Sequence, residues 1–318
     1  MSPRTALQSP VFLFYLALAA GLLVLAGALF GVLRWGLGKK VDDAWAAYRG
    51  WLLIVPLLCL CFFLGREAII IFVTIVAVFG FREFARASGL DRHKTMTAAV
   101  YLGISATGVV SLITDPNNRN PGWYGLFMAL PVFVIAMIVV IPVIRNRAEG
   151  QLQSLALAIV AFLYFGWMFG HLAFLANSAQ AYSYLGFLVV AVELSDVAAF
   201  VFGKMFGRTL LCSNVSPKKT WEGAAGALAV SLLLPWALRF SFPQFEVRDC
   251  LIAGLIVGIG SQLGDLVVSG FKRDLGIKDL GWIIPGHGGI LDRIDSLIYV
   301  SPLFFHYLRY RFDLNLPY

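Results

Sequence analysis

WYGLFMALPVFVIAMIVVIPVIR, residues 123–145, carries no charged side chain before Arg145 at its end. A helix rises about 1.5 Å per residue, so about 20 such residues cross the hydrocarbon core of a bilayer. A helix that is apolar on every side is stable only inside a large core or a membrane. The run therefore predicts a membrane-spanning helix.

Similar runs recur along the whole chain. The sequence is 59% hydrophobic and 14% charged, with a mean hydropathy of +0.81, which excludes a water-soluble domain. It predicts an all-α, polytopic integral membrane protein with about nine to ten transmembrane helices, for which the bilayer is a partner. The expected spans are about 10–34, 50–65, 67–82, 96–114, 123–145, 152–176, 181–204, 222–241, 249–271 and 294–310.

Two features within these spans predict local structure. The second and third are short and are separated only by Gly65-Arg66-Glu67, which predicts a tight helical hairpin or one re-entrant segment. In the ninth span, glycines at helical spacing (Gly254, Gly258, Gly260 and Gly264) predict close packing between helices.

The basic residues predict an orientation. Most of the 25 lysines and arginines follow the first, third, fifth, seventh and ninth spans. Because cytoplasmic loops carry an excess of Lys and Arg, these loops are expected in the cytoplasm. The net charge of +7 is then largely a topology signal, and basic runs with interleaved aromatic residues are absent, so nucleic acid is not an expected partner.

Two carboxylates fall inside the seventh span. Burying Glu193 or Asp196 in hydrocarbon costs at least about 3 kcal/mol. A metal, a cation or a water-filled cavity would compensate for this cost. The alternative is a hydrogen-bonded pair that joins two helices.

A basic segment follows that span, after Arg208. Ser216 before Pro217 predicts a helix N-cap with proline at the first helical position. Lys218 and Lys219 would then lie in the first turn, which is unfavourable unless an anion such as phosphate binds there. The alternative is a basic loop that serves topology alone.

A third cluster of charge surrounds a glycine-rich loop. Asp265 and Ser269 are four residues apart and share a helix face, and Lys272 lies near that face. After the loop, Asp292 and Asp295 share a face of the last helix. Carboxylates from two helix ends suit Mg²⁺, and nearby basic residues suit a polyphosphate.

These motifs resemble the phosphatidate cytidylyltransferase (CDP-diacylglycerol synthase) family. The likeness rests on Ser269-Gly-Phe-Lys-Arg273, Lys278-Asp279, Gly281, Pro285, His287-Gly-Gly289 and Asp292-Arg-Ile-Asp295. An upstream block is also similar: Ser195-Asp196, Gly207-Arg208, Ser216-Pro-Lys-Lys-Thr220 and Glu222-Gly223. The Arg82-Glu83-Phe84 turn is similar but less specific.

The resemblance implies that CTP and phosphatidic acid react to form CDP-diacylglycerol and pyrophosphate, with Mg²⁺ required. A second cation is a further candidate cofactor, because two-cation sites stabilise both the attacking and the leaving oxygens of a phosphoryl displacement. The resemblance implies catalytic roles for Asp265, Lys272, Arg273, Asp292 and Arg293. Metal ligands would come from Asp265, Asp292, Asp295 and Asp196. Phosphate or substrate contacts would come from Arg208, Ser216, Lys218, Lys219, Thr220, Ser269, Lys278, His287, Gly288 and Gly289.

The placement of the motifs, the basic loops and the resemblance together set expectations for organisation. Residues 1–120 are expected to form membrane scaffold helices, and residues 121–318 a membrane-embedded cytidylyltransferase region. A bacterial inner membrane location with a cytoplasmic site, and a homodimer, are implied, although the glycine-lined helix faces could equally serve packing within one chain. Two alternatives are a cytidylyltransferase for another membrane lipid phosphate and a cation-coupled transporter.

Overall fold

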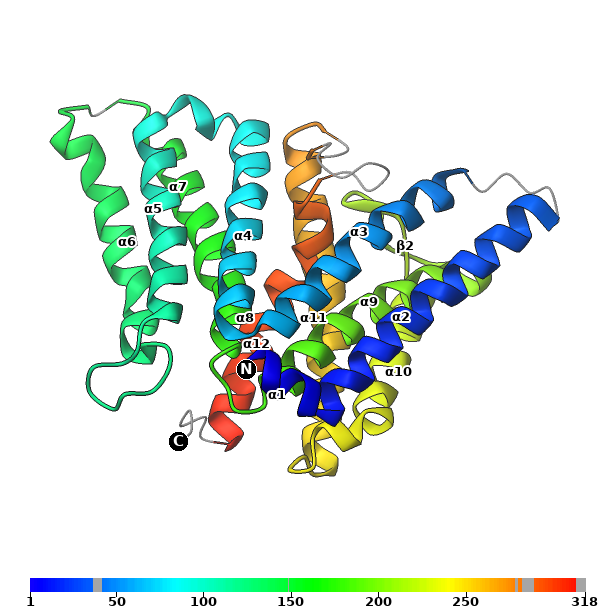
Figure 1. Cartoon of the computed structure of the whole chain (residues 1–318). Helices are drawn as coiled ribbons and strands as arrows, with labels where there is room; N and C mark the ends of the chain where they lie inside the picture. Colours follow the sequence, from blue (N-terminus) through cyan, green and yellow to red (C-terminus); the bar gives the residue numbers. More distant parts are fainter. Residues whose placement is uncertain (37–41, 148, 278–279, 282–288, 313–318) are drawn as a thin grey trace.

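The computed structural model describes residues 1–36, 42–147, 149–277, 280–281 and 289–312, and they form a helical bundle (Figure 1). The predicted Lys278, His287 and Gly288 lie outside these residues. The helices are α1 (Pro3–Gln8), α2 (Pro10–Gly31), α3 (Asp42–Leu64), α4 (Arg66–Ser88), α5 (Lys94–Leu112), α6 (Tyr124–Ile144), α7 (Gln151–Ala161), α8 (Phe169–Leu175), α9 (Ala181–Phe206), α10 (Trp221–Ala237), α11 (Val247–Asp274) and α12 (Leu291–Phe312). Shorter elements are η1 (Val32–Gly36), η2 (Leu90–Arg92), η3 (Phe162–Met168), η4 (Arg239–Ser241) and the strands β1 (Leu210–Cys212) and β2 (Ser216–Thr220).

Within the described ranges, seven helices are long and apolar enough to cross a membrane: Pro10–Gly36, Arg66–Ser88, Lys94–Leu112, Tyr124–Ile144, Gln151–Leu175, Ala181–Phe206 and Val247–Asp274. The predicted all-α, polytopic membrane protein is confirmed. The remaining predicted spans are also helical. They fall on α3, whose apolar part is Tyr48–Leu64, on α10 with 17 residues, and on α12, which carries charges at both ends.

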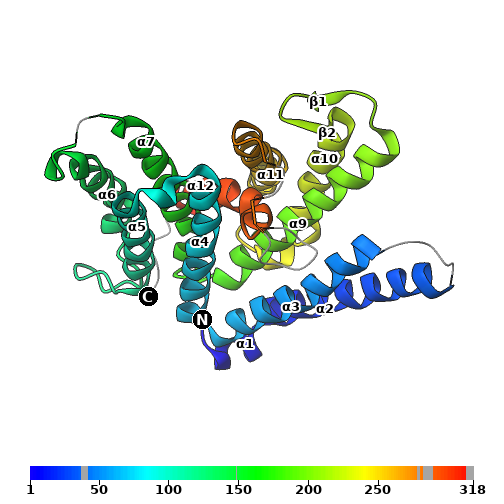
Figure 2. The ribbon, with the colours of Figure 1, turned by 90° about the horizontal axis from the view of Figure 1, so that it is seen from above.

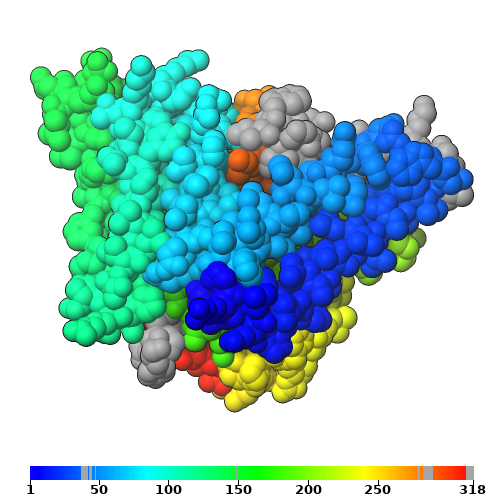
Figure 3. All heavy atoms as spheres, in the orientation of Figure 1, coloured from blue at the N-terminus to red at the C-terminus, as the bar shows by residue number. Residues whose placement is uncertain are grey.

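A single residue separates the second and third predicted spans. Helix α3 ends at Leu64 and α4 begins at Arg66, so Gly65 alone joins them. Gly65 has φ of 110°, a value that glycine adopts without strain. From this point α3 runs back along α2, away from α4 (Figure 2), and the two helices lie across one face of the molecule (Figure 3).

The basic loops share one end of the bundle. The ends of α4, α6 and α11, the β1–β2 hairpin and the start of α12 all lie toward the top of Figure 1. The N-terminus and the end of α12 lie toward the other end. The grouping of the basic loops on one side, which the sequence predicted, is therefore present in the fold.

Helix α11 packs between α10 and α12, and its glycines make this possible. A Cβ atom on Gly254 would lie 2.7 Å from the Leu232 Cα of α10. One on Gly260 would lie 3.0 Å from a methyl carbon of Val300 in α12. The predicted packing role of these glycines is confirmed, because they let both neighbouring helices approach α11 closely.

The prediction of a helix N-cap at Ser216 is wrong. Ser216–Thr220 forms strand β2, which pairs antiparallel with β1, and α10 begins only at Trp221. Thr220 is the N-cap instead, since its side chain accepts a hydrogen bond from Gly223 N at 3.1 Å. This later start keeps two lysines out of the first helical turn and puts Glu222 there, as the helix dipole favours.

Candidate active site

The site forms where α11 and α12 come closest. A Cβ atom on Gly264 would lie 2.6 Å from the Asp295 carbonyl oxygen and 2.8 Å from Ser296 Cα. No larger residue could sit there without separating the helices. The contact brings Asp265, the next residue of α11, beside the acidic first turns of α12.

Asp265 lies between a lysine and a hydroxyl group. Its Oδ2 atom is 2.7 Å from Lys219 Nζ, and its Oδ1 accepts a hydrogen bond from Ser269 Oγ at 3.1 Å. The predicted shared face of Asp265 and Ser269 is confirmed. About a third of the Asp265 side chain, 35%, remains exposed, so the carboxylate is accessible from the surface.

Asp292 forms a second acid–lysine pair with the same helix. Lys272 Nζ donates to Asp292 Oδ1 at 2.9 Å, and Gly289 N donates to Asp292 Oδ2 at 3.3 Å. The side chains of Lys272 and Asp292 are 17% and 12% exposed. Two acid–lysine pairs therefore lie at this end of the α11–α12 pair.

The other two predicted acids lie deeper. Ser296 N donates to the buried Asp295 at 2.7 Å, and Ser296 Oγ lies 3.4 Å from Asp196 Oδ2. The same hydroxyl lies 3.1 Å from the Ser261 carbonyl oxygen, so Ser296 connects α9, α11 and α12. Asp295 interacts electrostatically with Asp265, Asp196 and Asp292. The fold thus gathers four predicted carboxylates from three helices.

Strand β2 carries the upstream basic block to this cluster. Lys219 reaches Asp265 and also lies 3.4 Å from Gln262 Oε1. Ser216 is half-buried, Lys218 is exposed, and the Thr220 hydroxyl is used in capping α10. Of the predicted phosphate contacts on this hairpin, Lys219 is the one that the structure brings to the carboxylates.

Three predicted arginines take other positions. Arg208 is exposed between α9 and β1. Arg273 Nε donates to the Val215 carbonyl oxygen at 3.2 Å and so ties the end of α11 to the β-hairpin. Arg293, exposed in the first turn of α12, interacts electrostatically with Glu193 and Asp196.

Sequence reasoning assigned no role to two residues that reach the site. Gln262 precedes Asp265 by three residues, so helical spacing could have placed it on the same face. Glu83 of α4 accepts a hydrogen bond from Leu291 N at the start of α12. An acid at the end of an otherwise apolar span was the signal that could have marked it.

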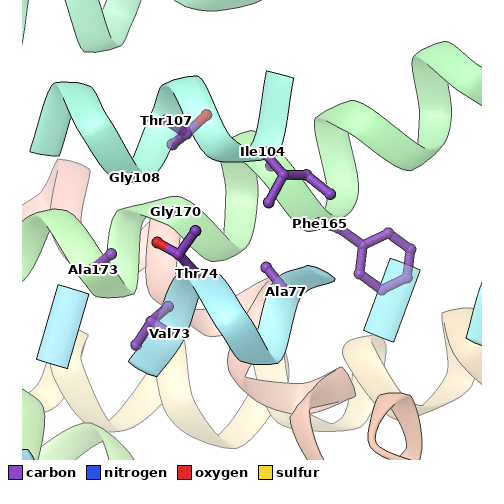
Figure 4. A pocket seen from close by; sticks show the side chains of 10 residues that line it. Val73, Thr74, Ala77, Ile104, Thr107, Gly108, Phe165, Gly170 and Ala173 are labelled. Carbon is purple, nitrogen blue, oxygen red and sulfur yellow. The ribbon is translucent and has the colours of Figure 1, made fainter. Parts of the chain in front are cut away.

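A small apolar cavity elsewhere in the bundle is not part of this site. It lies between α4, α5 and the η3–α8 segment, and Figure 4 shows Val73, Thr74, Ala77 and Thr107 among its lining residues. The hydroxyls of Thr74 and Thr107 donate to backbone carbonyls of their own helices. No lining residue is ionisable, so the cavity offers no groups for catalysis.

Fold and site together define a polytopic membrane protein with a cluster of paired acids and lysines at one end of its helices. The chain belongs to the cytidylyltransferase family, which matches residues 45–311. The resemblance seen in the motifs is thereby confirmed. It covers nearly the whole described bundle, from α3 to α12.

Individual relatives extend this match. A phosphatidate cytidylyltransferase of Staphylococcus aureus (strain COL) is 34% identical over 241 residues, which cover 75% of this chain and 89% of the relative. One of Staphylococcus haemolyticus is 40% identical over 161 residues, 50% of this chain and 60% of the relative. The uncharacterized protein YnbB of Escherichia coli K12 is 42% identical over 124 residues, 39% of this chain and 42% of the relative.

Proposed function

We propose that this protein is a phosphatidate cytidylyltransferase, which joins CTP and phosphatidic acid into CDP-diacylglycerol and releases pyrophosphate. The observation that carries the proposal is the double pair Lys219–Asp265 and Lys272–Asp292 at the meeting point of α11, α12 and β2. Lysines suit a triphosphate, and carboxylates suit the cation that accompanies it. Membership of the cytidylyltransferase family supports the same reaction.

The chain's own residues supply alignment and charge. A phosphate oxygen of the lipid forms a bond to the α-phosphorus of CTP, while the bond from that phosphorus to the bridging oxygen breaks and pyrophosphate leaves. The lipid phosphate is ionised near neutral pH, so no strong general base is required. Lys219 and Lys272 hold and neutralise phosphate oxygens, which keeps the two anionic substrates together.

Mg²⁺ fits the donor set of this site. Within the described part of the chain, no group of three His, Cys, Asp or Glu side chains gathers closely enough to bind a metal alone. Mg²⁺ usually uses only one or two carboxylates together with substrate phosphates. Asp265 and Asp292, both partly accessible, would hold it, with Asp295 and Asp196 behind them. Bound there, Mg²⁺ would offset negative charge on the CTP phosphates.

We extend the proposal to location and assembly. The site would face the cytoplasm of a bacterial inner membrane, which is supported by the basic loops at the site's end of the bundle. The homodimer that the resemblance implies is a further expectation. Protease or thiol-reagent access to the β1–β2 hairpin in inverted and right-side-out vesicles would test the orientation, and light scattering would test the oligomeric state.

The decisive experiment measures turnover by purified protein in mixed micelles. With labelled CTP, phosphatidic acid and Mg²⁺, we expect release of pyrophosphate and labelled CDP-diacylglycerol. Phosphorylated polyprenol and an ether-linked lipid phosphate, tested in parallel, distinguish the lipid tails. Turnover of one of those lipids alone would overturn the assignment to phosphatidic acid, and ion flux without CTP consumption would overturn the enzyme assignment.

A further inference from the structure

Glu83 is an acidic residue in the interior of the bundle, and its motif predicts no role for it. It belongs to α4, and only 4% of its surface is exposed. Burying a carboxylate is unfavourable unless hydrogen bonds compensate for the lost hydration. The groups that compensate Glu83 therefore indicate what the residue does.

Those groups are backbone amides at the start of α12. Leu291 N donates to Glu83 Oε2 at 3.0 Å, and the amide of Ile290 lies beside the same carboxylate. The first N–H groups of a helix have no acceptor within the helix, and negative charge is favourable beside them. Glu83 thus caps α12 from another helix, 208 positions away in the chain.

Two glycines make room for this carboxylate. A Cβ atom on Gly289 would lie 2.6 Å from Glu83 Oε2, and a Cβ atom on Gly281 would also overlap the carboxylate. A Cβ atom on Gly289 would further lie 3.0 Å from Gly281 N, so the two glycines are close neighbours. The backbone at Gly281 and at Gly289 therefore lies directly against the Glu83 carboxylate.

The residue held by this arrangement is Asp292, which follows Leu291 directly. Asp292 accepts hydrogen bonds from Lys272 Nζ and Gly289 N. Both bonds depend on where the first turn of α12 begins. A shift of that turn by about 1 Å would disturb the alignment on which catalysis by positioning depends.

We propose that Glu83 is a positioning residue, which fixes the first turn of α12 so that Asp292 faces Lys272. The effects on activity that we expect from substituting Glu83 rest on the proposed cytidylyltransferase function. Glu83 touches neither substrate nor reacting atoms and acts through the backbone of α12. The requirement is for a hydrogen-bond acceptor at this place, and glutamine supplies one through its amide oxygen.

Two substitutions separate positioning from direct catalysis. Glu83→Ala should lower kcat roughly 10- to 100-fold and raise the Mg²⁺ concentration for half-maximal rate, because supporting residues of metal sites have effects of this size. Glu83→Gln should stay within about threefold of the unsubstituted protein. The KM for phosphatidic acid should not move in either variant. Glu67→Gln, at the exposed far end of α4, is the matched control.

Hydrogen exchange gives a readout that does not require activity. The amides of residues 289–295 should exchange faster in Glu83→Ala than in the unsubstituted protein. The same amides in Glu83→Gln, and the α11 amides in both variants, should exchange at an unchanged rate. If the alanine variant does not fold, Glu83→Asp, one methylene short of the Leu291 amide, should show the same faster exchange. This measurement stands even if the protein turns over no lipid phosphate, so it separates failure of this inference from failure of the proposed function.

Two results would overturn the proposal. The first is that Glu83→Gln is as inactive as Glu83→Ala, while amide exchange at residues 289–295 is unchanged in both variants. This would mean that the negative charge itself acts in the reaction. Unchanged exchange and unchanged turnover in Glu83→Ala would mean that the carboxylate holds nothing that the reaction needs.

Discussion

The two ends of the α11–α12 pair each carry an aspartate beside basic residues, but they are built differently. At the end away from the site, Asp249 is 0% exposed, and its oxygens accept bonds from Tyr307 Oη at 2.5 Å, Arg311 Nε at 3.1 Å and Glu246 N at 2.8 Å. At the site end, Asp265 is 35% exposed and has one lysine and one hydroxyl partner.

The difference shows how one helix pair serves two purposes. A buried carboxylate with every oxygen satisfied joins two helices and resists rearrangement, because removing any partner leaves a costly unpaired group. A partly exposed carboxylate can be reached from the surface by a cation or a substrate. We call the Asp249 end the closed end and the Asp265 end the open end. We therefore expect substitutions at the closed end to change stability and those at the open end to change turnover.

The largest effect on turnover is expected for Asp292→Asn. The amide keeps the size of the side chain but removes the charge that pairs with Lys272 and would hold Mg²⁺. Removal of one group that stabilises developing charge typically costs roughly 100- to 1,000-fold in rate. Pyrophosphate release measures this loss, and a variant with more than a third of the original rate would contradict the assignment.

Lys219→Ala should have the next largest effect. The substitution removes the ammonium group 2.7 Å from Asp265, and we expect kcat/KM for CTP to fall roughly 10- to 100-fold. Lys204→Ala, which removes an exposed charge near the end of α9, is the control for a general loss of positive charge. Equal effects of both variants would show that the β2 lysine serves topology alone.

Gly264→Ala tests whether the close helix approach creates the open end. The added methyl group would meet the backbone of Asp295 and Ser296, so we expect a stability loss of about 1–3 kcal/mol and a clear fall in turnover. Gly270→Ala on the same helix meets nothing within 4 Å and should retain both properties. Thermal unfolding in detergent and initial rates give the two readouts, and identical behaviour of the variants would refute the packing argument.

Asp249→Asn should have the smallest effect on turnover. It removes a buried charge that is hydrogen-bonded to Arg311 and Tyr307, which should cost about 1–3 kcal/mol of stability. Turnover per folded molecule should stay within about twofold, because Asp249 lies in the first turn of α11, far along the helix from Asp265 and Lys272. A large fall in kcat with unchanged thermal stability would break the distinction between the two ends.

Much of the fold followed from local patterns. The apolar runs predicted the helices because a bilayer demands about 20 apolar residues per span. The packing role of the α11 glycines was also predicted correctly. The Ser216-Pro217 pair was not, although Ser9-Pro10 shows the same pattern as a true N-cap, with Ser9 Oγ accepting from Phe12 N at 3.2 Å. At Ser216-Pro217, pairing of the segment with β1 and the cap at Thr220 prevented a helix from starting. Neither contact can be inferred from the Ser-Pro dipeptide alone.

The candidate site was also predictable from the sequence only in part. The spacing of Asp265 and Ser269 fixed their contact, because residues four apart on a helix are neighbours. The ligand roles of the four aspartates, the phosphate roles of the basic residues and the boundary near residue 120 stay predictions. Glu83 was passed over because its partner, the start of α12, is distant in sequence.

By itself, the sequence determined the membrane class, the helices, the family and the residue types of the site, since each depends on local composition or on a contiguous motif. The tertiary structure decided which charges meet. Lys219 reaches Asp265 from a strand 46 positions earlier in the numbering, and Glu83 reaches α12 from the other side of the bundle. Such contacts depend on helix packing at glycines such as Gly264, where the approach of two backbones sets the distances between side chains.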